Sequence, residues 1–569
     1  MNKSVLYKFI SATGILAGFF CTIATAEAAN IYVDGTLSSS CSSGNYNIAT
    51  RNCTGNSGDA YKTVQTAVNA MSPGDHIVLR GGTYKECVKI PLSKNGSSWN
   101  EGSYNKIESC NSDSGCFPNE WAVLDGNQSC DSNGGAVLGY VSSTETGSAD
   151  LKYWWIERLE IKNGKNFNTA YGFNGNGGPF KIRYNYIHDN IAINCNNLPA
   201  GTWGQAWHDS VIEYNWYADN GGTAQHNCKH AGWISAYGND DSIADNMDFG
   251  GRVIDKSNNI QYNLVEGGNV GIGVKHFSLL TGRNTLGSDY EDTYKDWGNK
   301  IHHNIIRNSN GYSIGAHGDF WQIYNNIIDS PQGAGITMQY DYVGYWPMYK
   351  TTVYNNTIIN SAYNIGIIGL GKRIASKYNA DDYKYIYNNI VEGIGTGNKW
   401  CQEAPITPQL YCSKDLNINF QHHVVSHNYT YRPTTTIQYK LSTNYYSPQQ
   451  LESQTLTTGP KVAYNSNYSA SNPLYAGTTG VDRLRTRGSH VIEGSTTILN
   501  GGIGGAHPYL DGVFIPSYIG ATNPQNDTWV SGLLSFKNMI AGIPVTLRDA
   551  IAGQQPWQSS PPKPPIPNP

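Results

Sequence analysis

The chain has 569 residues, a formal net charge of −4 and only 14% charged residues. This balance argues against a nucleic-acid-binding protein, which is expected to be basic. The high contents of glycine (63) and tyrosine (40) argue against a helical bundle or a coiled coil. Hydrophobic residues make up 39% of the chain, which is enough to bury a core but too few for a protein with many membrane spans.

The N-terminus has the pattern of a secretory signal peptide. Lys3 and Lys8 flank the start, an apolar stretch follows over 9–23, and small residues surround Ala26. This order is typical of a cleaved signal, which we assign to residues 1–28. The apolar stretch is too short for a membrane span, and no later stretch is long enough. We therefore expect a secreted protein that is extracellular, periplasmic or at the cell surface.

The cysteine content agrees with secretion. There are 11 cysteines, and the predicted signal contains Cys21, so an even number remains. An even number in an oxidising compartment favours disulfide bonds. Cys110 and Cys116 are close in sequence, as are Cys401 and Cys412, so each pair could staple its own loop; the sequence leaves the connectivity open.

Near the start of the mature chain, one short segment has helical character. Residues 61–71 form an amphipathic pattern, and 73–75 and 77–79 then read as a turn and a strand. We expect the helix to close the apolar end of a repetitive fold, because terminal repeats need a cap.

A short motif, an aliphatic residue followed by two variable residues and asparagine, recurs along the chain. The seven copies begin at Ile182, Ile212, Ile260, Ile301, Ile323, Val353 and Ile386 and end at Asn185, Asn215, Asn263, Asn304, Asn326, Asn356 and Asn389. Each copy precedes a short strand-like stretch, and no helical period lies between them. This pattern predicts an all-β solenoid over 29–400, a parallel β-helix. An asparagine-rich β-sandwich would give no reason for the copies to be in phase.

The asparagines at equivalent bends are expected to form an amide ladder from coil to coil. Asparagine also tolerates the left-handed backbone that such a bend needs. The aliphatic positions lie 30, 48, 41, 22, 30 and 33 residues apart, so the shortest interval serves as one bare coil. The intervals that exceed this shortest one by most belong to the coils that start at Ile212 and Ile260. Because insertions in a solenoid become loops, often on the binding face, residues 220–300 are predicted to wall a site on one face.

The motif fades after residue 400. We expect a strand-rich continuation or cap over 401–553. The proline-rich tail, 554–569, is expected to be disordered.

Alignment of the strands that follow the bends brings chemical groups together. Segments 271–275, 313–317 and 335–339 align, and their aliphatic residues take the inward parity. Lys275 and His317 then take the outward parity, as does Gln339 at the next coil. Because stacked strands lie about 4.8 Å apart, Lys275 and His317 should be neighbours on one outer face.

This pair suits β-elimination of a uronic acid polymer. The reaction needs a base for the proton beside the carboxylate, a proton donor for the leaving oxygen and cationic help for the carboxylate. Lys275 could be the base if its surroundings lower its pKa, and His317 could donate or relay a proton. The alternative is a surface lysine and a stacking histidine.

A cluster of aspartates precedes this strand in the chain. Asp240, Asp241 and Asp245 crowd negative charge, and their oxygen ligands suit calcium. A bound calcium would acidify the proton next to a substrate carboxylate. The alternative is a solvated acidic loop.

The opening of the chain resembles a known superfamily. Segments 31–35 and 73–84, with the helix between them, resemble the start of secreted polysaccharide lyases of the right-handed parallel β-helix superfamily. The alginate lyase and chondroitinase B family and the family-nine pectate lyases are similar, over roughly 30–400. The resemblance implies a right-handed β-helix, with Lys275 as base and His317 as its assistant. It also implies that the aspartate cluster binds calcium, as in the pectate lyases.

The sequence also departs from that pattern. Ala316 stands where the alginate lyase family has an arginine, and Gly268 and Val270 stand where it has glutamates for calcium. Arg283, in the adjoining insertion, is the candidate to replace the missing cation.

Gln339, Trp233 and Trp321 are the expected substrate-binding residues, because aromatic faces stack on sugars; such rings also pack under loops. The most consistent interpretation is a secreted, monomeric polysaccharide lyase acting on an acidic glycan, with no nucleic-acid partner. A β-helix glycoside hydrolase could use carboxylates such as Asp240 and Asp241. A non-catalytic carbohydrate-binding or adhesin-like surface is the other alternative.

Overall fold

The structure is a computed structural model, and it describes most of the first 470 residues and part of the C-terminal segment. The described residues are 28–117, 119–127, 129–140, 150–165, 169–191, 200–205, 207–220, 232–237, 248–249, 252–253, 256–268, 270–277, 292, 295–329, 331, 333–339, 350–361, 365–370, 384–393, 409–413, 423–431, 439–441, 444–446, 468–469, 502, 504–518, 520–521, 529 and 533.

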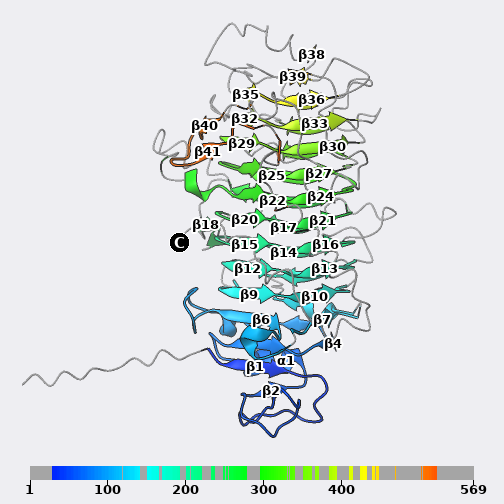
Figure 1. Ribbon diagram of the computed structural model, residues 1–569, viewed down its shortest axis with the longest axis vertical. Helices are drawn as coiled ribbons and strands as arrows, with labels where there is room; N and C mark the ends of the chain where they lie inside the picture. The colour runs from blue at the N-terminus through cyan, green and yellow to red at the C-terminus, as the bar shows by residue number, and fades with distance from the viewer. Residues whose placement is uncertain are drawn as a thin grey trace, which may run out of the picture.

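Three long sheets of 13, 12 and 12 strands run along the molecule and form a parallel β-helix (Figure 1). Each coil contributes one strand to sheet I, one to sheet II and one to sheet III. Each strand therefore pairs in parallel with the strand at the same place in the next coil. The antiparallel exception in these sheets is the last pair of sheet III, β37 with β38. The fold class predicted from the repeat is confirmed.

Sheet I contains, in spatial order, β2 (Ala60–Tyr61), β1 (Asn30–Val33), β3 (His76–Leu79), β6 (Asn105–Ser109), β9 (Trp154–Glu157), β12 (Phe180–Arg183), β15 (Val211–Glu213), β20 (Asn259–Gln261), β23 (Lys300–His302), β26 (Gln322–Tyr324), β29 (Thr351–Tyr354), β32 (Lys384–Tyr387) and β35 (His423–Ser426).

Sheet II contains β4 (Gly82–Lys85), β7 (Ala122–Asp125), β10 (Leu159–Lys162), β13 (Tyr186–His188), β16 (Trp216–Ala218), β21 (Leu264–Glu266), β24 (Ile305–Arg307), β27 (Ile327–Asp329), β30 (Thr357–Ser361), β33 (Ile390–Gly393), β36 (Tyr429–Tyr431) and β39 (Tyr468–Ser469).

Sheet III contains β5 (Val88–Lys89), β8 (Ala136–Gly139), β11 (Tyr171–Asn174), β14 (Ala200–Gln205), β17 (Gly232–Tyr237), β22 (Val270–Phe277), β25 (Ile314–Gly318), β28 (Ile336–Gln339), β31 (Ile365–Leu370), β34 (Gln409–Ser413), β37 (Tyr439–Leu441) and β38 (Asn444–Tyr446). Two short hairpins lie outside the sheets: β18 (Asp248–Phe249) with β19 (Arg252–Val253), and β40 (Gly505–Ala506) with β41 (Phe514–Ile515).

The aliphatic residues of the repeat fill the interior of the coil. The following residues are buried to within 1% exposure: Ile182, Ile212, Ile260, Ile301, Ile323, Val353 and Ile386. They stack in register from one coil to the next, for example Ile260 on Ile301 and Ile301 on Ile323. Each coil therefore buries apolar surface that it could not bury alone, which explains why the fold needs many repeats.

The seven predicted asparagines form the expected amide ladder. Asn185 donates from Nδ2 to Oδ1 of Asn215 at 3.0 Å, and the same bond repeats through Asn389. The ladder extends to an eighth rung, because Asn389 donates to Asn428 at 2.9 Å. Val425 begins this further copy of the motif, which is not among the seven copies recognised from the sequence.

The prediction that these asparagines take the left-handed conformation is wrong. The residue with positive φ is the one before each ladder asparagine: Tyr184, Tyr214, Tyr262, His303, Asn325, Asn355, Asn388 and His427. The tight bend is thus made one residue earlier, which leaves the ladder amide free to bond both above and below.

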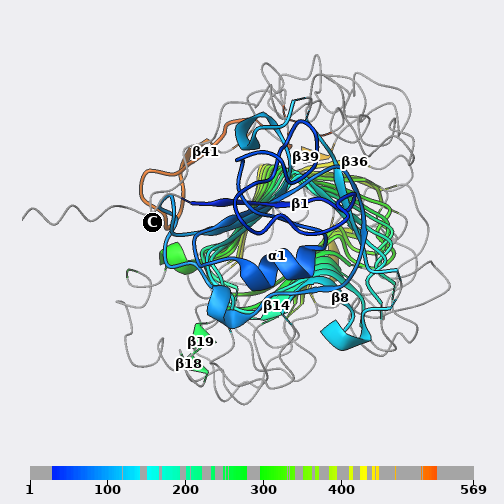
Figure 2. The same ribbon diagram turned by 90° about the horizontal axis from the view of Figure 1, so that it is seen from below.

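The N-terminal end of the coil is closed by α1 (Val64–Ala70), which lies across the interior when the molecule is viewed along its axis (Figure 2). The apolar side of α1, with Val64, Ala67 and Val68, is buried in the main core. At the other end of the coil, all three sheets continue past residue 400: sheet I ends at Ser426, sheet III at Tyr446 and sheet II at Ser469. Part of the segment 401–553 is therefore a continuation of the coil.

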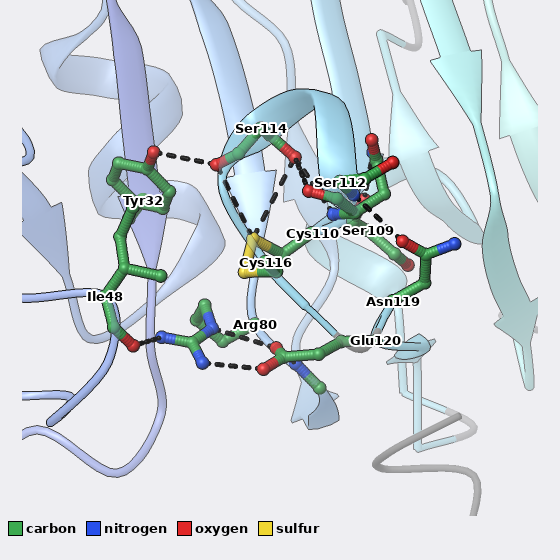
Figure 3. Close-up of a disulfide and its surroundings, with 12 residues drawn as sticks. Tyr32, Ile48, Arg80, Ser109, Cys110, Ser112, Ser114, Cys116, Asn119 and Glu120 are labelled. Carbon is green, nitrogen blue, oxygen red and sulfur yellow. Dashed lines mark hydrogen bonds and ion pairs between the residues drawn. A yellow bond between two sulfur atoms is a disulfide. The ribbon is translucent and has the colours of Figure 1, made fainter. Parts of the chain in front are cut away.

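Disulfides link Cys41 to Cys53, Cys87 to Cys130, and Cys110 to Cys116. The last pair is a staple predicted from the sequence, and it lies beside the Tyr32 hydroxyl and the Arg80–Glu120 ion pair (Figure 3). The predicted pairing of Cys401 falls outside the described residues. No helix in the described part of the chain is long and apolar enough to span a membrane.

A segment near the C-terminus folds back along the outside of the coil. We call residues 502–521, as far as they are described, the C-terminal strap; it contains β40 and β41 and lies beside β29 and β32 (Figure 1). Its backbone carbonyls at Pro516 and Tyr518 accept hydrogen bonds from Asn388 and Asn355, at 2.9 and 2.6 Å. Further along, Trp529 and Leu533 pack on the outer face of sheet II.

Candidate functional site

The predicted alignment of the sheet III strands is confirmed. Ile272 pairs with Ile314 and Ile314 with Ile336, and all three are fully buried. Val274 then pairs with Ala316, and Ala316 pairs with Met338. The lysine and the histidine that follow therefore lie on adjacent strands near their C-terminal ends.

A row of polar residues crosses the ends of five sheet III strands. Gln205 on β14 pairs with Tyr237 on β17, and Tyr237 pairs with Lys275 on β22. The next coils contribute His317 and Gln339, one residue after Ala316 and Met338. We call Gln205, Tyr237, Lys275, His317 and Gln339 the lysine row; at these positions the structure describes backbone and register.

The lysine row contains a β-bulge. Val274 pairs with Ala316, but the next pair is Phe277 with Gly318, so two residues of β22 face one residue of β25. These two residues are Lys275 and His276, and both stand against His317. A bulge redirects the side chains at that point of a strand and is often found next to active sites.

Beyond β14 the chain turns toward sheet I, and the described residues there form a rim next to the lysine row. His208 forms a β-bridge with Lys256 of the next coil. The His208 ring also pairs with Asp209 at 3.0 Å. The Lys256 ammonium lies 3.9 Å from the centre of the Trp297 ring. These residues place cationic and aromatic groups in the turns between sheet III and sheet I.

The other predicted site residues have different outcomes. Trp233 lies on β17, four residues before Tyr237, where the structure describes the backbone. Trp321 is fully buried in the main core, so it cannot stack on a sugar and its predicted role is wrong. The residue directly precedes β26, and its ring follows the inward parity there. Asp240, Asp241, Asp245 and Arg283 lie outside the described residues.

A second cluster of titratable groups lies on sheet II. The carboxylate of Glu160 contacts His188 at 3.1 Å and Lys162 at 3.0 Å, and His188 contacts Asp189 at 2.7 Å. Burial lowers the pKa of His188, but the bonds to Asp189 and Glu160 outweigh burial and raise it. Glu160 is fully buried and its oxygens are occupied, so this cluster is structural and gives no support to a hydrolase with two accessible carboxylates.

Sequence reasoning missed two members of the site. Tyr237 is the register partner of Lys275, but its strand carries no copy of the asparagine motif nearby and was not aligned. His276 was not considered, because strict alternation gives no reason to place a second residue of β22 opposite His317, whereas the register shift does. Within the described residues, no group of three His, Cys, Asp or Glu side chains could hold a metal ion.

Comparisons with known proteins find similar folds among solved structures. No protein-family model and no curated protein matches the sequence. The complex of XylC with xylose covers 78% of this chain and 82% of that chain, with 9% identity and a TM-score of 0.40. Pectate lyase Pel9A covers 80% and 93%, with 13% identity and a TM-score of 0.38. A mannuronic acid-specific family 6 polysaccharide lyase from human gut microbiota covers 71% and 88%, with 13% identity and a TM-score of 0.33.

Proposed function

We propose that the protein is a secreted polysaccharide lyase that cleaves a uronate-containing glycan by β-elimination. The observation that carries the proposal is the lysine row, in which the strand register brings Lys275 next to His317 on one side and Tyr237 on the other. An amine, an imidazole and a phenol at the ends of adjacent strands supply the base, relay and acid that the reaction requires. The disulfides found among the described residues are consistent with an extracellular protein.

In the proposed reaction the neutral amine of Lys275 removes the proton at C5 of the uronate. The electron pair of that C–H bond forms the C4–C5 double bond, and the bond from C4 to the leaving oxygen breaks. Tyr237 donates its phenolic proton to that oxygen, and the proton on Lys275 returns to the phenolate through solvent. His317 assists Lys275, while Trp233 and Gln339 contact the sugar.

The carboxylate of the substrate needs a cation, since negative charge builds up on it in the transition state. Arg283 and Lys256 are the candidate protein cations. Calcium held by Asp240, Asp241 and Asp245 is the further candidate, because carboxylate oxygens are the ligands that calcium prefers.

Incubation with a panel of uronate polymers tests the proposal. A lyase forms an unsaturated ring that absorbs in the ultraviolet, whereas a hydrolase forms reducing ends without that absorbance and a binding protein forms neither. We expect Lys275→Ala to lower kcat at least 1,000-fold, as expected for loss of a general base. A chelator should lower the rate if calcium binds the carboxylate.

The control variant is Lys89→Ala, which removes an exposed lysine from β5 of the same sheet. It should retain full activity. Normal turnover by Lys275→Ala would contradict the assignment of the base, and a panel that yields reducing ends without absorbance would replace the lyase by a hydrolase.

A further inference from the structure

Two histidines lie where the C-terminal segment meets the coil. His507, on the strap, has its ring centre 6.0 Å from Tyr354 on β29. His303, in the bend after β23, has its ring centre 5.4 Å from Trp529 and 5.0 Å from Tyr262. Each imidazole therefore contacts an aromatic ring more than 150 positions away in sequence, and each contact joins the C-terminal segment to the coil.

The hydrogen bond of His507 requires a neutral ring, and the contact between His303 and His302 requires that at least one of these two rings is neutral. Nδ1 of His507 accepts a bond from the backbone N–H of Tyr509 at 3.4 Å, and its Nε2 is buried with no hydrogen-bond partner among the described residues. Nδ1 of His303 lies 2.8 Å from Nδ1 of His302, a contact that needs one N–H and one lone pair. If both of these rings were protonated, two N–H groups would face each other.

The groups around the histidines also disfavour protonation. Lys300, on β23, acts on both His302 and His507, and both effects lower the histidine pKa. The rings packed against the histidines are uncharged, from Tyr262, Tyr324, Tyr354, Tyr509 and Trp529. Burial lowers the pKa of His303 to about 3, and burial followed by Lys300 lowers that of His507 to about 4.

We propose that the C-terminal strap, together with Trp529 further along the chain, is an acid-released element, which leaves the outer wall of the β-helix when His507 and His303 become protonated. Release places His507 in water and frees the side of His303 that Trp529 covers. It also uncovers the aromatic surface of sheet I that the strap hides, including Phe320 and Tyr387. The inference does not depend on the enzymatic activity.

The sign of the effect follows from the difference between the two states. A histidine in water has a pKa of about 6.5, whereas the docked rings bind protons only near pH 3 to 4. The docked state is therefore favoured above pH 6.5 and loses its advantage as the pH falls below that value. From pH 7.5 to pH 5.0, a histidine that becomes fully solvated shifts the balance toward release by about 30-fold. His507 is freed in this way, whereas the His303 ring stays beside Tyr262 and adds a smaller factor.

Hydrogen–deuterium exchange of the full chain measures this release. The reporters are amides held in the docked state, such as Gly520, which donates to Asn388 at 2.7 Å, and His507, which donates to Val513 at 2.8 Å. After correction for the intrinsic pH dependence of exchange, protection over 502–521 should fall about 30-fold or more between pH 7.5 and pH 5.0. Amides of the core strands should keep their protection. Ionic strength is held constant because Lys295 and Asp511 form an exposed ion pair at 3.0 Å.

The matched variants are His303→Asn and His507→Gln. Asparagine occupies the position of His303 in the next three coils, at Asn325, Asn355 and Asn388, with the same positive φ, so the first change keeps the bend. His507→Gln should recover about 30-fold of the lost protection at pH 5.0, His303→Asn should recover a smaller part, and the double variant should show little pH dependence.

His208→Asn is the control, because His208 lies in a coil that the described strap does not contact; it should leave the pH response unchanged. Equal protection of the native strap at both pH values would overturn the proposal, and so would a double variant that still releases its strap at pH 5.0. If the double variant fails to fold, the two single variants decide, because each must recover part of the protection.

Discussion

Asn304 shows how single residues hold adjacent coils together. Its side chain is fully buried, and its Nδ2 donates to the carbonyl of Ile260 at 2.9 Å and to Oδ1 of Asn326 at 3.0 Å. Its Oδ1 accepts from the backbone N–H of Asn263 at 2.9 Å. Every polar atom of the amide thus has a partner, which is the condition for burying it without penalty.

Asn304→Asp keeps the shape of this side chain and removes its donor. The carbonyl of Ile260 would lose its bond from the side chain, and Oδ1 of Asn326 would keep the backbone N–H of Asn304 but face a buried carboxylate. A buried acceptor left unpaired costs about 1–3 kcal/mol, and more when the group that faces it is charged. We expect the free energy of unfolding to fall by about 3 kcal/mol or more, measured as a lower urea midpoint. Asn100→Asp, at an exposed position, is the control. Equal midpoints for the two variants would contradict the role of the ladder.

The strands of sheet III are the elements that assemble the candidate site. Parallel pairing places residues that are 22 to 42 positions apart in the sequence in one row, and the bulge in β22 sets two residues, Lys275 and His276, against His317. Sheets I and II have a different role, because the C-terminal segment packs on their outer faces through Tyr509 and Trp529.

Tyr237→Phe removes one oxygen from this row. If Tyr237 is the proton donor, kcat should fall about 100- to 10,000-fold with little change in KM. A substrate whose C4 leaving group needs no protonation should restore the rate. Tyr140→Phe, at the end of β8 in the same sheet, is the control. Full activity of Tyr237→Phe would move the acid role to His317 or His276.

At the scale of the molecule, the two ends of the coil are secured differently. The disulfides of the described residues lie between Cys41 and Cys130, in the first coils. The strap secures the later coils through Asn325, Asn355 and Asn388. Because each coil of a solenoid contacts only its neighbours, damage at one end should stay local.

Removal of the Cys87–Cys130 disulfide tests this. It spans 43 residues, so its loss, in the double variant Cys87→Ala/Cys130→Ala, should cost about 4 kcal/mol by chain entropy. Loss of Cys110–Cys116, which spans 6 residues, should cost about 2 kcal/mol. Hydrogen exchange should increase in β4–β8, while β23–β33 keep their protection. A uniform loss along the coil would contradict local coupling.

The sequence by itself determined the parallel coil, its inward rows and the register that sets Lys275 beside His317. These features depend on a local repeat, on the alternation of strand residues and on a fixed distance between stacked strands, all of which can be read along the chain. The asparagine ladder followed from the same repeat.

Only the tertiary structure decided the rest. The bulge at Lys275 breaks the strict alternation of inward and outward residues on which the prediction for β22 depended. Trp321 is buried because its ring fills the interior next to β26. The doubled asparagines, such as Asn355 before the ladder residue Asn356, look alike in sequence. One completes the ladder and the other binds the strap at Tyr518, 163 residues away, a contact that no local pattern encodes.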